Sequence, residues 1–176
     1  FATICYPYQT DMSTSVCIDT DELNLKGSPK VCDVEDISLS GGQGAPMAVT
    51  KVESRMLRKE GNIVPHFIIH VENKGGGVVF RTDDNVHESV KKICSKDAIS
   101  HEDKNFNTVF VTAYLGPEID DNLLDCSPEE PDKPENKDKG YVRLIGDKDI
   151  IRCTYKGTPI SENRGTYKSP LIVKMD

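Results

Sequence analysis

The sequence predicts an all-β protein built as an antiparallel β-sandwich. Three observations lead to this fold class: short runs rich in branched residues recur about every ten residues, Gly and Pro interrupt them, and several runs alternate apolar with polar residues. At 176 residues, the chain is long enough for one well-cored domain, or for one domain with a small appendage.

The predicted strands follow one another along most of the chain. In order, they are ATICY (2–6), TSVCI (14–18), VCDVEDISLS (31–40), MAVTKVESRML (47–57), HFIIHVE (66–72), VVFR (78–81), NTVFVTAYL (107–115), YVRLI (141–145), DIIRCTY (149–155) and PLIVKM (170–175). Residues 85–96 offer the only helical face, through Val86, Val90 and Ile93, and a short helix there stays open. The proline-rich and charged stretch 127–140 predicts a long exposed hairpin loop.

A boundary is expected near residues 41–46. Residues 1–44 would form a strand-rich N-terminal extension and residues 45–176 the sandwich domain. The extension has too few apolar residues for a core of its own. We therefore expect its strands either to extend the sheets of the larger domain or to pair with a neighbouring molecule.

The charge balance excludes two classes of partner. A formal net charge of −7 leaves no basic footprint for nucleic acid or for an anionic membrane surface. No apolar run approaches the ~20 residues of a membrane span. The chain begins with Phe1 rather than Met, so we expect a processed or a shortened form.

Six cysteines predict three disulfides in an oxidising compartment. No CxxC pair is present and the four histidines are scattered, which argues against a zinc site. Buried free thiols are the remaining alternative. Cys17–Cys32 would close a short loop, worth roughly 3 kcal/mol on the loop-entropy model, and Cys126–Cys153 would flank the predicted hairpin. With these two pairs assigned, Cys5 and Cys94 are left as the third pair by elimination.

The stretch ISLSGGQGAP (37–46) contains LSGGQ, the signature letters of ABC-transporter ATPases. That motif works only beside a phosphate-binding GxxxxGK[ST] loop, which the sequence lacks. Residues 39–46 are therefore predicted to be a connector between two strands.

No other residue pattern predicts catalysis or a cofactor. His66 and His70 would lie about 13 Å apart along a strand, too far to share a metal ion. The acidic turns do not match a spaced calcium loop, although calcium there stays open; they comprise Asp83, Asp84, Asn85, Glu118, Asp120, Asp121 and Asn122. No GxSxG elbow is present. We expect no enzyme, no metal and no cofactor.

The segment HVENKGGGVVF (70–80) contains V-x-N-x-G and, with MAVTKVESRM before it, resembles CARDB-like immunoglobulin-fold modules of prokaryotic cell-surface proteins. A wider similarity, through VCID (16–19), residues 31–53 and SPLIVKMD (169–176), is to uncharacterised predicted secreted proteins of small-genome archaea. The resemblance implies an immunoglobulin-like sandwich and a cell-surface location. It implies no catalytic residues.

We expect a non-catalytic extracellular structural or adhesive protein that assembles with copies of itself, as a filament or surface polymer, through donated or paired edge strands. The alternative is an extracellular module that binds a glycan or a peptide. Such a module would need exposed aromatic residues on one face, for which Tyr6, Tyr8, Tyr155 and Tyr167 are the only candidates. Rim and core packing is the competing interpretation of these tyrosines.

Overall fold

Ten strands make up most of the described part of the chain. The computed structural model describes residues 4–27, 29–40, 43–81, 90–91, 93–94, 105–117, 123–129 and 139–176. Within them the strands are β1 (Thr10–Asp19), β2 (Ile37–Ser38), β3 (Met47–Lys59), β4 (Asn62–Asn73), β5 (Thr108–Leu115), β6 (Leu124–Ser127), β7 (Gly140–Arg143), β8 (Lys148–Tyr155), β9 (Ile160–Ser161) and β10 (Thr166–Met175).

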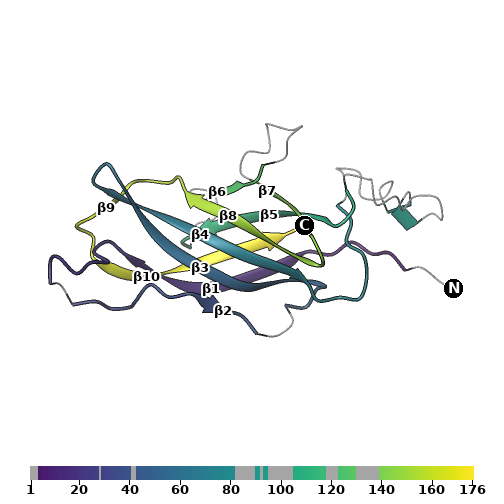
Figure 1. The fold of residues 1–176 in the computed structure, drawn as a ribbon, viewed down its shortest axis with the longest axis horizontal. Helices are drawn as coiled ribbons and strands as arrows, with labels where there is room; N and C mark the ends of the chain where they lie inside the picture. The colour runs from purple at the N-terminus through teal and green to yellow at the C-terminus, as the bar shows by residue number, and fades with distance from the viewer. Residues whose placement is uncertain are drawn as a thin grey trace.

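These strands form two sheets that stack as a sandwich (Figure 1). The first sheet has the order β1-β10-β5-β7, and the second has the order β2-β3-β4-β8-β6, with β9 added beside β4. Every pairing between strands is antiparallel. The prediction of an all-β antiparallel sandwich is thus confirmed, while its immunoglobulin-like character stays a prediction.

The core forms because alternate residues of the long strands point between the sheets. Along β4, buried and half-buried residues alternate from end to end, and Phe67 and Ile69 are completely buried. From the opposite sheet, β10 contributes Leu171 and Val173, which are equally inaccessible. A single apolar cluster joins both sheets.

Segment 1–44 contributes to this core. β1 pairs with β10 over its whole length, from Thr10 beside Met175 to Asp19 beside Thr166. Its Val16 and Ile18 are buried in the shared cluster. Of the two possibilities left open by the sequence, the structure therefore contains the first, in which the N-terminal segment extends a sheet of its own chain.

Three predicted strands are shorter or absent. Residues 4–6 of ATICY are not in a strand, only Ile37–Ser38 of residues 31–40 are, and VVFR contributes a single bridge between Phe80 and Phe106. The 85–96 helix lies mostly outside the described residues, although Val90, Lys91, Ile93 and Cys94 are helical. The ends of the predicted hairpin loop 127–140 are bridged, since the Tyr141 N–H donates to the Pro128 carbonyl at 2.7 Å, but the flanking strands β6 and β7 belong to different sheets. Residues 130–138 lie outside the described part.

The register of β1 and β10 defines the two ends of the sandwich. One end, called the strap end, lies where Thr10 pairs with Met175. The other, called the loop end, lies where Asp19 pairs with Thr166. Ten residues of strand separate these ends by about 30 Å. In Figure 1 the C-terminus and the start of β1 lie at the strap end.

Candidate interaction surfaces at the two ends of the sandwich

An apolar groove lies at the strap end. One wall is the strap, defined as residues 4–8, and the other is the turn after β4, from Asn73 to Phe80. Val90 and Ile93 complete the lining, with Pro46 and Asp176 nearby. The groove has a volume of about 410 Å³, which lies within the usual range for small-ligand sites.

The strap is fixed at two points. The Cys5–Cys94 disulfide ties it to the helical residues that line the groove. The Tyr8 side chain packs against the core, and its hydroxyl is buried without a hydrogen-bond partner among the described residues. Burial, and next the neighbouring Tyr6, raises the pKa of Tyr8 to about 12. Between these anchors, Tyr6 stays 59% exposed.

The opposite wall is shaped by Asn73. Its side-chain amide donates to the Gly77 carbonyl at 2.8 Å, and its side-chain oxygen accepts from the Gly75 N–H at 3.0 Å. Gly75 lies so close to Pro46 that an added Cβ would meet the proline Cβ at 2.9 Å. Asn73 and Gly75, the asparagine and the glycine of V-x-N-x-G, therefore shape this turn and with it the groove wall.

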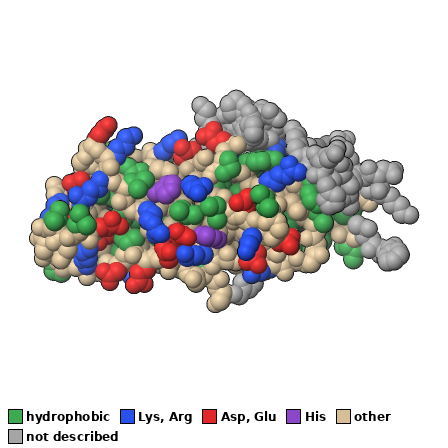
Figure 2. Space-filling view, in the orientation of Figure 1, with side chains coloured by type: hydrophobic (Ala, Val, Ile, Leu, Met, Phe, Trp, Pro, Cys, Tyr) green, Lys and Arg blue, Asp and Glu red, His purple; other side chains and the backbone are tan. Residues whose placement is uncertain are grey.

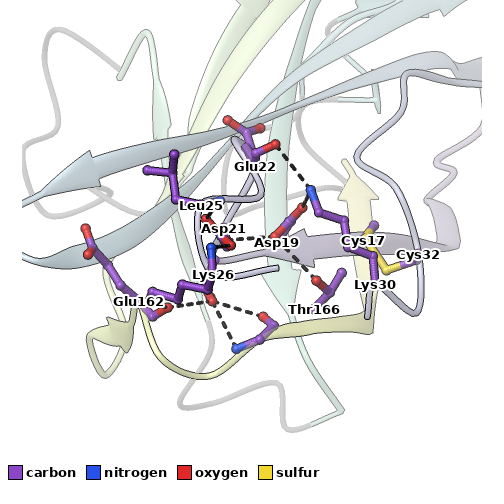
Figure 3. Close-up of polar contacts among 12 residues, drawn as sticks. Cys17, Asp19, Asp21, Glu22, Leu25, Lys26, Lys30, Cys32, Glu162 and Thr166 are labelled. Atoms are coloured by element: carbon purple, nitrogen blue, oxygen red, sulfur yellow. Dashed lines mark hydrogen bonds and ion pairs between the residues drawn. A yellow bond between two sulfur atoms is a disulfide. The ribbon is translucent and has the colours of Figure 1, made fainter. Parts of the chain in front are cut away.

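The loop end carries a polypeptide loop organised by aspartates. Asp19 and Asp21 are almost completely buried. The Asp21 carboxylate accepts the backbone N–H groups of Leu25 at 3.0 Å and Lys26 at 2.8 Å (Figure 3). The hydrogen bond from Lys26 holds the pKa of Asp21 below its usual range, and the bond from Leu25 adds to this.

Two lysines and a disulfide hold the same loop to the sandwich. The Lys26 ammonium donates to the Glu162 carbonyl at 2.7 Å. Lys30 forms an ion pair with Asp19 at 2.7 Å, and this hydrogen bond raises the pKa of Lys30. The Cys17–Cys32 disulfide closes the segment. The backbone of this loop is thus fixed by several independent interactions.

Leu23 and Leu25 project from this fixed loop into solvent. Each is 72% exposed. In Figure 3 the Leu25 side chain points away from the polar contacts around Asp21. The sequence pattern predicted no strand between residues 18 and 31 and did not identify these leucines as exposed. The available signal was a pair of leucines two residues apart between Cys17 and Cys32.

Gln43, the last residue of the LSGGQ stretch, makes a structural contact. The Gln43 side chain bridges to β3: its amide donates to the Val49 carbonyl at 2.9 Å and its oxygen accepts the Val49 N–H at 3.0 Å. This contact lies beside the β-bulge between Val49 and Lys51. Outside Gly41 and Gly42, which are not among the described residues, residues 39–46 connect β2 to β3 as predicted.

His66 and His70 share the outer face of β4 but have different partners. His66 Nδ1 is 2.9 Å from the Thr154 hydroxyl, and burial, followed by Arg152, lowers the His66 pKa. His70 Nε2 is 2.9 Å from the Glu53 carboxylate. The two imidazoles therefore have separate hydrogen-bond partners. No cluster of potential metal ligands occurs among the described residues.

The same outer face carries balanced charge. Asp36 pairs with Lys51 at 3.0 Å and with Arg55 at 2.8 Å, and both cations also contact Glu53 at 3.0 Å. The Arg55 bond, and next Lys51, lowers the pKa of Asp36. Figure 2 shows acidic and basic side chains intermixed on the face turned to the viewer. The described side chains on that face form no patch of a single charge sign.

The four candidate tyrosines do not gather on one face. Tyr6 and Tyr8 belong to the strap, with ring centroids 6.3 Å apart. Tyr155 ends β8, and Tyr167 lies near the start of β10, at the loop end. Three of them, Tyr8, Tyr155 and Tyr167, are partly buried against the core. These three rings contribute to packing.

The remaining predicted residues are either cross-linked or outside the described chain. The structure joins Cys5 to Cys94, Cys17 to Cys32 and Cys126 to Cys153, the same three pairs as those predicted. The acidic turns at 83–85 and 118–122 lie outside the described residues. In the described part, no helix has the length and apolarity needed to span a bilayer.

Comparison with known proteins finds no matching family model, no matching curated protein and no matching solved structure. The resemblance of residues 45–81 to CARDB-like modules and the wider archaeal similarity therefore stay predictions. The fold and its cross-links define a class, the disulfide-bonded antiparallel β-sandwiches. Three disulfides fit a protein that folds in an oxidising environment.

Proposed function

We propose that this protein is a non-catalytic extracellular structural subunit that assembles with copies of itself. One observation carries the proposal: several large exposed apolar side chains lie at the ends of the sandwich. Ile4, Tyr6 and Val78 lie at the strap end, and Leu23 and Leu25 lie at the loop end. Ile4, Tyr6 and Val78 line one groove, and exposed apolar side chains gathered in one place are typical of an interaction site.

Two further features support this proposal. Three disulfides suit a chain that works outside the cell, where thiols are not kept reduced. The mixed charge of the outer face suits a protein partner better than nucleic acid, which would need a basic stripe. Edge-strand pairing is a second possible contact, because β1 lies at the edge of its sheet in the described structure.

Sedimentation velocity over a wide range of protein concentrations tests the proposal. We expect the sedimentation coefficient to rise continuously with concentration, as it does for an open-ended polymer. Reduced and alkylated protein serves as an unfolded control, with circular dichroism to report folding. A folded protein that stays monomeric at the highest soluble concentration would contradict the proposed function.

A binding module for an extracellular peptide is the second candidate. The observation that favours it is the groove itself, whose volume of about 410 Å³ suits one or two apolar side chains of a ligand. A monomeric protein whose tyrosine fluorescence changes on titration with an apolar peptide, with the change lost in Tyr6→Phe, would favour this candidate over self-assembly.

A further inference from the structure

We propose that Leu23 and Leu25 of one copy dock in the strap groove of the next copy, so that subunits join head to tail. This inference rests on the proposed self-assembly and specifies its contact. The occupant of the groove is a second copy of this chain. It is inserted by the loop defined by residues 19–27, and the groove is formed by the strap and the turn after β4.

The loop has the properties of a preformed binding element. The Asp21 carboxylate fixes the Leu25 and Lys26 amides, and the Asn24 N–H donates to the Asp21 carbonyl at 2.8 Å. Lys30 adds an ion pair to buried Asp19. Because the backbone is already ordered, burying the two leucines costs little additional backbone entropy. A rigid loop that exposes two leucines is well suited to insertion in an apolar groove.

The groove offers the matching chemistry. Ile4, Tyr6, Val78, Val90 and Ile93 give it apolar walls. Ile4 is 83% exposed and Val78 is 53% exposed, so both have surface available to a partner. Leucine side chains gain most from leaving water when such apolar walls surround them.

The placement of the two surfaces determines the kind of assembly. They lie at opposite ends of β1 and β10, about 30 Å apart along the strands. A contact between two different surfaces is heterologous, and it repeats indefinitely unless the rotation between subunits closes a ring. Surfaces at opposite ends favour a linear polymer whose subunits all point the same way.

Mixing two complementary variants tests the contact. The loop variant carries Leu23→Ser and Leu25→Ser, and the groove variant carries Val78→Asp. Each variant alone should be monomeric, with an association constant reduced at least about 100-fold, equivalent to about 1.4 kcal/mol for each tenfold step. An equimolar mixture should form a dimer and nothing larger, because only one intact loop and one intact groove remain available to each other.

A matched leucine controls for general loss of apolar surface. Leu57 is 47% exposed on the outer side of β3, away from the groove. Leu57→Ser should assemble like the unmodified protein. Circular dichroism and thermal melting check that every variant folds. If Val78→Asp does not fold, Tyr6→Ser on the strap replaces it.

Three outcomes would overturn the inference. A loop variant that polymerises like the unmodified protein would exclude the leucines while leaving self-assembly intact. A groove variant that still associates alone would indicate contact between identical surfaces. A mixture that stays monomeric would exclude the groove as the receptor; binding of a free apolar peptide by that mixture would instead favour a peptide ligand. Failure of the unmodified protein to associate is separate, because it contradicts the proposed function itself.

Discussion

Asp21 illustrates how a single carboxylate shapes a surface several residues away. It is almost completely buried, yet its oxygens are used by two backbone N–H groups, those of Leu25 and Lys26. A carboxylate that accepts hydrogen bonds in its charged form has a lowered pKa, as it does here. The exposed position of Leu25 therefore depends on the ionised state of its neighbour.

A pH prediction follows for this residue. Because the folded pKa of Asp21 lies below the ordinary 3.8, its stabilisation of the loop is complete above that value. It is lost as the pH falls through the folded pKa. We expect Asp21→Asn to remove most of the amide-exchange protection at Leu25 and Lys26 even at neutral pH. Asp33→Asn, at an exposed position, should leave both protection factors unchanged; equal loss in the two variants would contradict the prediction.

His66 gives a second pH prediction, for a group whose neutral form, rather than its charged form, is favoured in the folded protein. Burial lowers its pKa in the folded state, so the unfolded chain binds a proton first as the pH falls. Stability should therefore decline as the pH drops through 6.5, the ordinary value. His66→Gln can still bond Thr154 and should weaken this decline. Urea unfolding of both proteins at several pH values checks it; an unchanged pH dependence would contradict it.

At the scale of elements, β1 shows what the sequence could and could not establish. Its alternating apolar residues predict a strand, and the structure contains one. Which sheet receives a strand depends on the available edges, and local composition does not encode them. The same limit applies to ATICY: its residues favour a strand, but residues 4–6 are not in a sheet, and the Cys5–Cys94 disulfide ties them to a helical residue instead.

Several long strands were predictable because their patterns are sustained. The HFIIHVE pattern of β4 alternates over enough residues to identify the buried face, and Phe67 and Ile69 are indeed buried. Strands of two residues, such as β2 and β9, carry no such pattern. The two ends were harder still, because the position of Leu25 depends on its backbone hydrogen bond to Asp21, which forms only in the folded chain.

A substitution at Ile18 tests whether β1 completes the core of its own chain in solution. The Ile18 side chain is completely buried between the sheets. Ile18→Ala should lower the free energy of unfolding of the monomer by about 2–5 kcal/mol, because it removes buried methyl groups and leaves a cavity. Ile145→Ala, at a side chain that is 80% exposed, should change it by less than about 0.5 kcal/mol. Denaturant unfolding measures both; similar values would mean that β1 does not complete this core.

At the scale of the whole molecule, net charge opposes the proposed assembly. Each subunit carries a formal charge of −7, so neighbouring copies repel one another. The proposed contact is apolar and is not weakened by salt. We therefore expect the association constant to rise between ~0.1 M and ~1 M NaCl, as the Debye length falls from about 10 Å to about 3 Å. Sedimentation at both salt concentrations measures this; weaker association in high salt would indicate a contact made by opposite charges.

The cross-link between Cys5 and Cys94 also has a consequence for the life history of the protein. It joins the strap, which is one wall of the groove, to the helical residues that complete the lining. Under reducing conditions this tie is absent, and the strap is no longer joined to the helical residues. For the proposed assembly, we therefore expect oxidation of this pair to complete the groove, so that subunits polymerise only after they reach an oxidising compartment.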